Sequence, residues 1–146
     1  MAITGEYQPS SDARTRDQVE AIERSGGTEG TTMRGMPVVV VTMLGATSGK
    51  VRKIPVMRVE HEGVYAIVAS LGGAPKNPVW YSNLIANPVV DVQDATHKAS
   101  YRMREITGDE YATWWERAVE AYPDYADYQT RTDRVIPILL AEPIAD

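Results

Sequence analysis

Short apolar segments fill the middle of this 146-residue chain, and they constrain its fold more than any other feature. Val38 to Leu44 is an almost unbroken apolar run, and Ile54 to Glu60 alternates between apolar and other residues. Val64 to Ser70 follows after a turn at Glu62-Gly63. These patterns predict strands, and the short turn predicts that the last two form a hairpin. The core therefore begins as an antiparallel sheet.

The second half of the chain adds further strands and only two helices. The expected segments are a helix over Pro78 to Ala86, strands over Val89 to Gln93 and Ala99 to Glu105, a helix from Thr107 to about Tyr122, and a strand over Val135 to Ala141. Thr107 and Glu110 have the spacing of a capping box. A parallel α/β sheet would need a helix between nearly every pair of strands. We therefore expect a mainly β fold with added helices (α+β), in the form of a small closed barrel.

The N-terminal region departs from this strand pattern. Ser11 or Asp12 can cap a polar helix that ends near Arg24, where Gly26-Gly27 stops it. The glycine-rich segment that follows is typical of a connector. We predict a helical arm and connector over residues 1–36 and one barrel domain over residues 37–146. The arm carries many charges and few apolar side chains, which argues against a membrane anchor.

Composition excludes several classes of function. The net charge is -5, from 15 basic and 20 acidic residues, so we expect no nucleic-acid partner. The chain has no cysteine, and its two histidines, His61 and His97, lack metal-ligand spacing, so we expect no metal site. Redox chemistry would therefore need a bound cofactor. The start of the chain has no secretory signal, which predicts a cytoplasmic protein, with peripheral membrane contact left open.

The segment from Val68 to Asn83 is the strongest candidate for a binding site. Gly72-Gly73 removes two side chains, which lets another molecule approach the backbone. Lys76 supplies a cation, and Asn77-Pro78 has the pattern of a helix cap followed by a first-turn proline. Trp80 adds aromatic area. Together these features suit a flat anionic ligand, although an ordinary strand-to-helix connection with a core tryptophan has the same pattern.

Three blocks of the sequence resemble a known family. Leu44 to Pro55 is similar to a Gly-x-x-Ser/Thr-Gly-x-x-Arg-x-x-Pro element, and Val68 to Asn83 is similar to an Ala-Ser-x-Gly-Gly-x-x-x-Asn-Pro-x-Trp-Tyr-x-Asn signature. Tyr122 to Pro137 resembles a C-terminal tyrosine segment. All three patterns are motifs of the deazaflavin-dependent nitroreductase and quinone reductase family of actinobacteria, which binds coenzyme F420. The chain therefore resembles this family. The resemblance implies a split β-barrel of the flavin/deazaflavin-binding type, with about six antiparallel strands and two or three flanking helices.

The same resemblance implies which residues hold the coenzyme. Arg52 would bind the phosphodiester through charge-assisted hydrogen bonds. The full set of implied cofactor contacts is Ala46, Thr47, Ser48, Arg52, Lys53, Ile54, Pro55, Met57, Val68, Ala69, Ser70, Leu71, Lys76, Asn77, Val79, Trp80, Asn83 and Tyr125. Several relatives carry lysine where this chain has Thr47 and Leu71. This difference predicts weaker phosphate or tail binding, or a greater reliance on Arg52, Lys50 and Lys76.

Three tyrosines near the C-terminus are candidates for a substrate pocket. Tyr122, Tyr125 and Tyr128 are spaced three residues apart, which places them along one stripe of a short helix. Amphipathic packing would produce the same spacing. The resemblance instead implies that these tyrosines, with Met57 and Ser70, surround the substrate, and that Tyr125 is the catalytic hydrogen-bond or proton donor.

These observations predict an oxidoreductase that uses reduced F420 to deliver a hydride to a small-molecule acceptor. The acceptor would be a quinone, a nitroaromatic compound or an activated enone, and a homodimer is left open. Two alternatives remain at this point: a carrier that binds the deazaflavin without turnover, and a barrel that binds flavin mononucleotide. An open pocket walled by tyrosines would favour the enzyme, and a short phosphate site would favour flavin mononucleotide.

Overall fold

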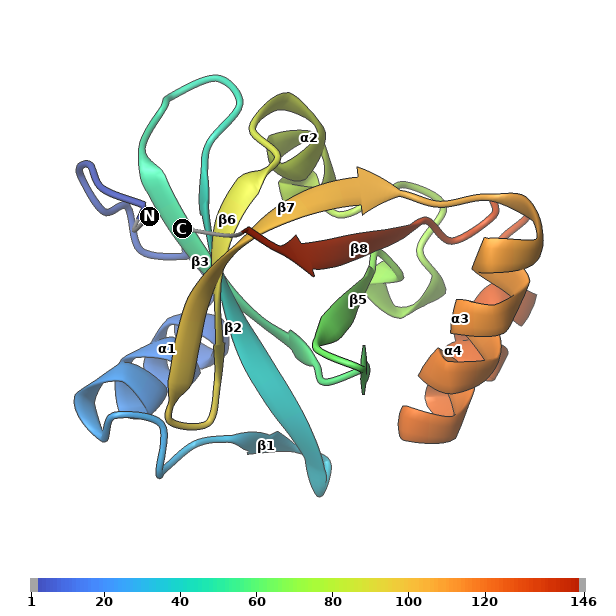
Figure 1. Cartoon of the computed structure of the whole chain (residues 1–146), viewed down its shortest axis with the longest axis horizontal. Coiled ribbons are helices and arrows are strands. Elements are labelled where there is room, and N and C mark those ends of the chain that lie inside the picture. The colour runs from blue at the N-terminus through green and yellow to red at the C-terminus, as the bar shows by residue number, and fades with distance from the viewer. Residues whose placement is uncertain (1–2, 145–146) are drawn as a thin grey trace.

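The computed structural model describes residues 3–144, and its main element is one curled antiparallel sheet (Figure 1). The strands of this sheet are β1 (Thr32–Met33), β2 (Met36–Leu44), β3 (Val51–Met57), β4 (Glu60–His61), β5 (Val64–Val68), β6 (Val89–Asp94), β7 (His97–Glu105) and β8 (Ile138–Pro143). Two of the eight strands, β1 and β4, have only two residues, so six longer strands build the sheet as expected.

The order of the strands leaves the barrel split. The strands follow the order β1-β2-β6-β7-β8-β5-β4, and β3 pairs with β2. Among the named strands of the described chain, β3 pairs only with β2, and β5 pairs only with β4 and β8; an isolated bridge also joins Val51 of β3 to Tyr7. The predicted hairpin between Ile54 to Glu60 and Val64 to Ser70 is therefore wrong for most of its length, because only the two residues of β4 pair with β5 across the turn. Strands β3 and β5 lie near each other without forming a ladder, and both line the cleft described below. The predicted split β-barrel is confirmed.

Burial on both faces explains the apolar run of β2. Val39 and Val41 point into the barrel, where they pack with Ile67 of β5. Val38 and Val40 belong to a second cluster on the outer face, which the helices cover. A strand that is covered on both sides has no solvent-facing positions, so its sequence is a continuous apolar run rather than an alternating one.

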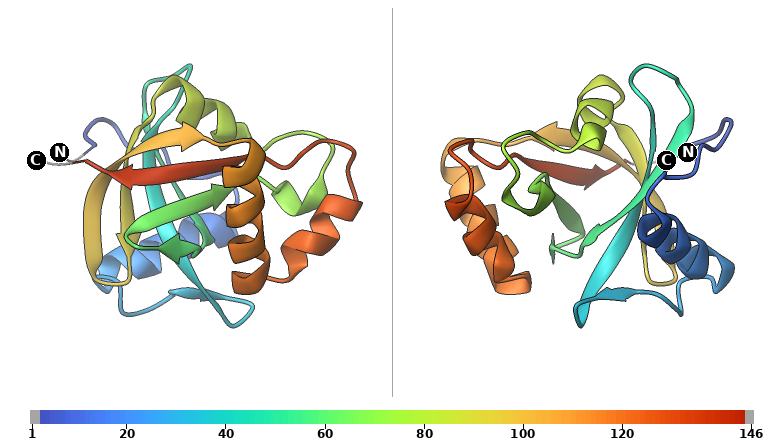
Figure 2. Two further views of the ribbon diagram at one scale, coloured as in Figure 1. Left: turned by 45° about the vertical axis from the view of Figure 1, so that its right-hand side comes forward. Right: turned by 180° about the vertical axis from the view of Figure 1, so that it is seen from behind.

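Four α-helices flank the sheet, one or two more than predicted. They are α1 (Ala13–Arg24), α2 (Val79–Ala86), α3 (Gly108–Ala121) and α4 (Asp124–Thr130), and a 3₁₀ turn, η1 (Leu71–Gly73), precedes α2. Tyr122-Pro123 separates α3 from α4, because proline disfavours continuation of the helix through the preceding residue. Figure 2 shows the α3–α4 pair and α1 on opposite sides of the sheet. No helix of residues 3–144 is long and apolar enough to cross a membrane.

The N-terminal helix forms where predicted and packs against the barrel. The carboxylate of Asp12 accepts hydrogen bonds from the backbone N–H groups of Arg14 and Thr15, which caps α1. Val19 and Ile22 are buried, and they join the outer apolar cluster. The helix therefore adds to the core through its thin apolar stripe. The domain boundary at residues 36/37 stays a prediction.

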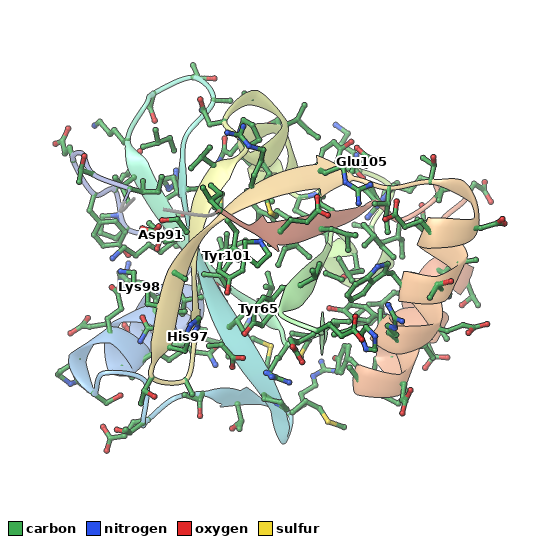
Figure 3. The ribbon with its side chains drawn as sticks, viewed as in Figure 1. Tyr65, Asp91, His97, Lys98, Tyr101 and Glu105 are labelled. Atoms are coloured by element: carbon green, nitrogen blue, oxygen red, sulfur yellow. The ribbon has the colours of Figure 1, made fainter. Side chains whose placement is uncertain are left out.

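Polar contacts inside the sheet fix the β6–β7 hairpin. Figure 3 shows Tyr65 and Tyr101 together in the sheet, and their rings meet edge to face with centroids 5.6 Å apart. Tyr65 donates a hydrogen bond of 2.6 Å to Asp94. Asp91 is only 3% exposed, and it accepts hydrogen bonds from the N–H of Ile3 and the hydroxyl of Ser100. The hairpin therefore holds the start of the chain.

Two of the predicted helix caps are wrong, and in both an arginine from another segment binds a side chain of the predicted cap. Helix α2 begins at Val79, and Asn77 does not cap it, because its side-chain oxygen accepts a 2.8 Å hydrogen bond from Arg134. Thr107 precedes α3 without a side-chain cap, and Glu110 pairs with Arg104 at 2.8 Å instead of closing a capping box.

The last strand begins three residues later than expected, at Ile138 rather than Val135. Its predicted first residues belong to the irregular segment that contains Arg134.

Candidate functional site

A cleft runs from the outer edge of β3 across the start of α2, and it has two lobes. The first, called the aromatic lobe, has a volume of about 230 Å³, and the second, called the polar lobe, has a volume of about 600 Å³. Four residues line both: Pro55, Leu71, Pro78 and Trp80. The lobes are therefore adjoining parts of one site.

The aromatic lobe is lined by β3, β5, the end of α3, α4 and the β1–β2 turn. Its residues beyond the four shared ones are Met33, Arg34, Val56, Met57, Val68, Ser70, Tyr122, Tyr125 and Tyr128. All five residues that we expected to bind substrate are among them. The walls are apolar except for the phenols, the Ser70 hydroxyl and one guanidinium, which suits an aromatic ligand with a few polar atoms.

Tyr125 and Tyr128 of α4 form one packed cluster with Tyr122, which lies at the C-terminal end of α3, so the three tyrosines do not share one helix as their spacing predicted. The rings of Tyr122 and Tyr125 meet edge to face with centroids 5.0 Å apart, and those of Tyr125 and Tyr128 are 6.1 Å apart. The hydroxyls of Tyr122 and Tyr128 are hydrogen-bonded to each other at 2.9 Å. The same side chains therefore pack together and line the lobe, and their contact with a substrate stays a prediction.

Tyr125 differs from its two neighbours at its hydroxyl. The side chain is buried, with 4% exposure, yet its oxygen has no hydrogen-bond partner among residues 3–144. No fully buried side-chain oxygen or nitrogen in the described residues lacks a partner, so this oxygen must keep access to the lobe. Burial raises the pKa of Tyr125 above its ordinary value, and the neighbouring phenols add to the effect. The hydroxyl therefore stays protonated and can donate a hydrogen bond to a ligand.

The sequence did not indicate the residues of the β1–β2 turn. Arg34 lies at the mouth of the aromatic lobe and forms an ion pair of 3.1 Å with Asp124 at the start of α4. The neighbouring phenols of Tyr122 and Tyr128, followed by a hydrogen bond to Asp124, raise the pKa of Arg34. No local pattern marks this position, because its partners lie about ninety residues further along the chain.

The polar lobe lies between β3, α2 and the residues that lead into α1. Its residues beyond the shared four are Ser10, Ser11, Asp12, Thr15, Arg52, Lys53, Ile54, Val79 and Asn83. Arg52 is half-buried and forms no ion pair with any carboxylate of the described chain. Its charge is therefore available to an anionic ligand. Ser10 to Thr15 were not predicted, because only the tertiary packing of α1 on β3 brings them to the lobe.

Lys53 has a different environment from the one expected. Its ammonium group forms an ion pair of 2.5 Å with Glu23 of α1, and both side chains are largely buried. The ammonium also lies 5.1 Å from the centre of the Tyr7 ring. Lys53 lines the polar lobe, but its charge is already balanced, so Arg52 is the stronger anion-binding group.

The structure brings most of the predicted cofactor residues to the cleft. Six of them line neither lobe: Ala46, Thr47, Ser48, Ala69, Lys76 and Asn77. Thr47, Ser48 and Lys76 are exposed to solvent. The N–H of Ala46 donates to the side chain of Asn83, so the turn braces α2 beside the polar lobe. Trp80 is half-buried and lines both lobes, so it is not only a core residue.

The loop between β5 and α2 is also held in an unusual shape. Leu71 has a left-handed backbone (φ 45°) and is 53% exposed at the junction of the lobes, a conformation that costs free energy for a residue with a side chain. At Gly73 an added Cβ would lie 2.4 Å from the carbonyl oxygen of Tyr128. The lack of a side chain at Gly73 therefore lets the backbone of α4 pack against the loop. We had predicted that it would let a ligand approach the backbone.

Comparison with known proteins gives a consistent result. The family model for F420H(2)-dependent quinone reductase matches residues 14–143. An F420H(2)-dependent quinone reductase of Mycobacterium tuberculosis is 31% identical over 107 residues, which cover 71% of this chain and 72% of the relative.

Two solved structures are more similar. One, described as an F420-H2 dependent reductase, is 54% identical with a TM-score of 0.70, covering 73% of this chain and 94% of that one. The other, described as a domain-swapped dimer, is 51% identical with a TM-score of 0.73, covering 87% of this chain and 96% of that one.

Proposed function

The chain belongs to the F420H(2)-dependent quinone reductase family, and on this basis we propose that it transfers a hydride from reduced coenzyme F420 to a quinone. The observation that carries the proposal is the Tyr125 hydroxyl, which is without a protein partner among residues 3–144 and open to the aromatic lobe. A carbonyl oxygen of a quinone is a suitable acceptor for its hydrogen bond.

The residues of the cleft fit this coenzyme. Its phosphate and glutamate tail is anionic, and the polar lobe offers the unpaired guanidinium of Arg52 together with the hydroxyls of Ser10, Ser11 and Thr15. Its flat ring system suits the region between the lobes, where Pro55, Leu71 and Trp80 lie. The aromatic lobe then remains for the acceptor.

The protein contributes orientation and electrostatics to the reaction. Reduced F420, when bound, supplies the hydride. Reduction of a quinone to a hydroquinone takes up that hydride and one proton, so negative charge builds on a carbonyl oxygen. A hydrogen bond from Tyr125 would stabilise this charge in the transition state. The raised pKa of Tyr125 keeps the donor protonated at neutral pH. The rings of Tyr122 and Tyr128 pack edge to face with centroids 6.0 Å apart, and both contact the ring of Tyr125, which fixes its orientation.

Nitroaromatic compounds and activated enones are further candidate acceptors, because both build negative charge on an oxygen as they are reduced. The open aromatic lobe favours turnover over a carrier function, which would need no acceptor space beside the coenzyme. The volume of the polar lobe favours a cofactor with a long tail over flavin mononucleotide.

The proposal also covers the localisation and the oligomeric state of the protein. We propose a cytoplasmic enzyme, since the arm is strongly charged and no described helix could span a membrane. A homodimer is also proposed, supported by the similar solved structure that is described as a domain-swapped dimer. Light scattering of the purified protein at several concentrations measures the oligomeric state, and a mass of 16.1 kDa throughout would refute the dimer.

A spectral titration with both cofactors tests the main proposal. We expect the protein to bind F420 with a change in its fluorescence, and to oxidise reduced F420 only when a naphthoquinone is added. Binding of F420 without quinone-dependent oxidation would leave the carrier as the correct function. Binding of flavin mononucleotide with no binding of F420 would overturn the cofactor assignment.

A further inference from the structure

Arg134 lies behind the cleft, and its guanidinium is engaged entirely with one loop. It donates four hydrogen bonds to the segment of residues 69–77 between β5 and α2. The acceptors are the carbonyl oxygens of Ser70 at 2.5 Å, Ala74 at 2.8 Å and Ala69 at 3.1 Å, and the side-chain oxygen of Asn77 at 2.8 Å.

The electrostatic environment of Arg134 differs from that of an ordinary surface arginine. No carboxylate of residues 3–144 forms an ion pair with it. Desolvation by burial lowers the pKa of Arg134 from its ordinary value. Its charge is therefore stabilised chiefly by the carbonyl dipoles of the loop, and only a planar guanidinium presents enough donors in the required directions.

The same arginine is anchored to the tyrosine helix through its backbone. The side chain of Gln129 in α4 donates a 2.8 Å hydrogen bond to the carbonyl oxygen of Arg134 and accepts one of 3.1 Å from the N–H of Ile136. On the other side of the loop, Gly73 lies directly against the carbonyl of Tyr128. The loop, Arg134 and α4 thus form one hydrogen-bonded and packed unit.

We propose that Arg134 is a positioning residue that sets the separation between the β5–α2 loop and the tyrosine wall of the aromatic lobe. Ser70 and Leu71 of this loop line the same lobe as Tyr125, so a shift of the loop changes the shape of the space between coenzyme and acceptor. Arg134 lines neither lobe and touches no ligand site itself. The effect on turnover rests on the proposed function, whereas the effect on the loop does not.

Replacement of Arg134 by methionine tests the loop directly, with Arg104→Met as a matched control. Arg104 also forms several hydrogen bonds, to Glu110 and Glu142, but it is half-exposed and lies outside the cleft. Hydrogen–deuterium exchange is the readout, because it needs no cofactor and no activity. Arg134→Met should raise exchange at least tenfold in residues 69–77 while leaving β6 and β7 protected, and Arg104→Met should not affect the loop.

A uniform increase of exchange across the sheet would mean that Arg134 only supports global stability, and unchanged exchange in the loop would also refute the proposal. Should Arg134→Met fail to fold, Arg134→Lys and Asn77→Ala answer the same question. The lysine keeps the charge but loses most of the donors, and the alanine removes one acceptor. Both should raise exchange in the loop, the lysine more than the alanine.

The rate of turnover provides a second, independent test of the role of Arg134. With reduced F420 and a naphthoquinone, Arg134→Met should lower kcat by about 10- to 100-fold, because small displacements of reacting groups have effects of this size. Combined with Tyr125→Phe, the loss should be less than the product of the two single losses, because both changes disturb the same geometry. Strictly multiplicative losses would contradict positioning. No turnover by the wild type would instead refute the proposed function, and the exchange result would still decide the role of Arg134.

Discussion

The aromatic lobe takes its walls from α4 and the end of α3, from β3 and β5, and from the β1–β2 turn, whereas the polar lobe takes its walls from β3, α2, the first turn of α1 and the residues before it. In the aromatic lobe the rings pack edge to face, and two hydroxyls satisfy each other. In the polar lobe most side chains are at least partly exposed, and the guanidinium of Arg52 is unpaired within the described chain.

This difference suggests that the polar lobe determines the affinity for the coenzyme and that the aromatic lobe determines the rate of the reaction. A packed wall holds a donor in one orientation, which is what stabilisation of a transition state requires. A partly exposed guanidinium and hydroxyls adapt to a flexible anionic tail, and they supply binding free energy that is the same in the ground state and the transition state. We therefore expect changes in the aromatic lobe to alter kcat and changes in the polar lobe to alter the affinity for the coenzyme.

Tyr125→Phe should have the largest effect, because it removes only the unpartnered hydroxyl of the aromatic lobe. We expect the rate with a quinone to fall by about 100-fold, the size of a typical contribution from a proton or hydrogen-bond donor. The affinity for F420 and the melting temperature should change little, since the ring and its packing remain. A lower melting temperature with an unaltered steady-state rate would show that Tyr125 is a structural residue. The aromatic lobe would then have no separate role in the rate of the reaction.

Arg52→Ala should act on binding alone. We expect F420 to bind more weakly by about 1.5 to 3 kcal/mol, the usual range for hydrogen bonds to a charged group. The rate at saturating coenzyme should stay near that of the wild type. Fluorescence titration measures the affinity, and Lys76→Ala is the matched control, because Lys76 is an exposed cation outside both lobes. An equal loss in the control would show that overall charge, and not the polar lobe, attracts the coenzyme.

Alkaline pH should produce the smallest effect of the three, a loss of folding stability that comes from the tyrosines of the aromatic lobe. Burial raises the pKa values of Tyr122 and Tyr125, so above pH 10 the unfolded chain loses its phenolic protons before the folded one. Their contribution to stability is complete below pH 10 and declines as the pH rises towards the folded pKa values.

The melting temperature should therefore fall above pH 10. Tyr122→Phe should reduce the steepness of that fall, although Tyr65, whose pKa is also raised mainly by burial, contributes as well. Lys76→Ala should leave the steepness unchanged, because Lys76 is exposed and lies outside both lobes. A fall of equal steepness in the wild type and in Tyr122→Phe would show that the tyrosine cluster is not the source.

Local patterns were sufficient to predict most of the sheet. The apolar run of β2 and the turn at Glu62-Gly63 depend on neighbours in the sequence, and both are found where expected. The errors in the helix caps have a different cause. Asn77 and Glu110 have the residue types of good caps, but Arg134 and Arg104 engage them through tertiary contacts. A local pattern cannot report this competition.

The candidate site shows the same division. The family resemblance predicted one wall of each lobe, through the three tyrosines for the aromatic lobe and through Arg52 and Lys53 of β3 for the polar lobe. Arg34 and the Ser10 to Thr15 segment were missed, because each reaches the cleft from an element that has no cofactor-like pattern of its own. The role of Arg134 was missed because its side chain lines neither lobe and acts only through its hydrogen bonds to the loop. The missed residues complete the walls or hold the loop, so the sequence predicted the chemistry better than the scaffold that supports it.

A truncated coenzyme tests the separation of the lobes most directly. The probe is the deazaflavin ring compound that lacks the phosphate and the glutamate tail, titrated against the wild type, Arg52→Ala and Tyr125→Phe. We expect Arg52→Ala to bind this compound as well as the wild type does, while it binds intact F420 more weakly. Tyr125→Phe should bind both compounds as the wild type does and should turn over slowly with each reduced form. A loss of affinity in Arg52→Ala that is equal for both compounds would place Arg52 at the ring and contradict a separate lobe for the tail.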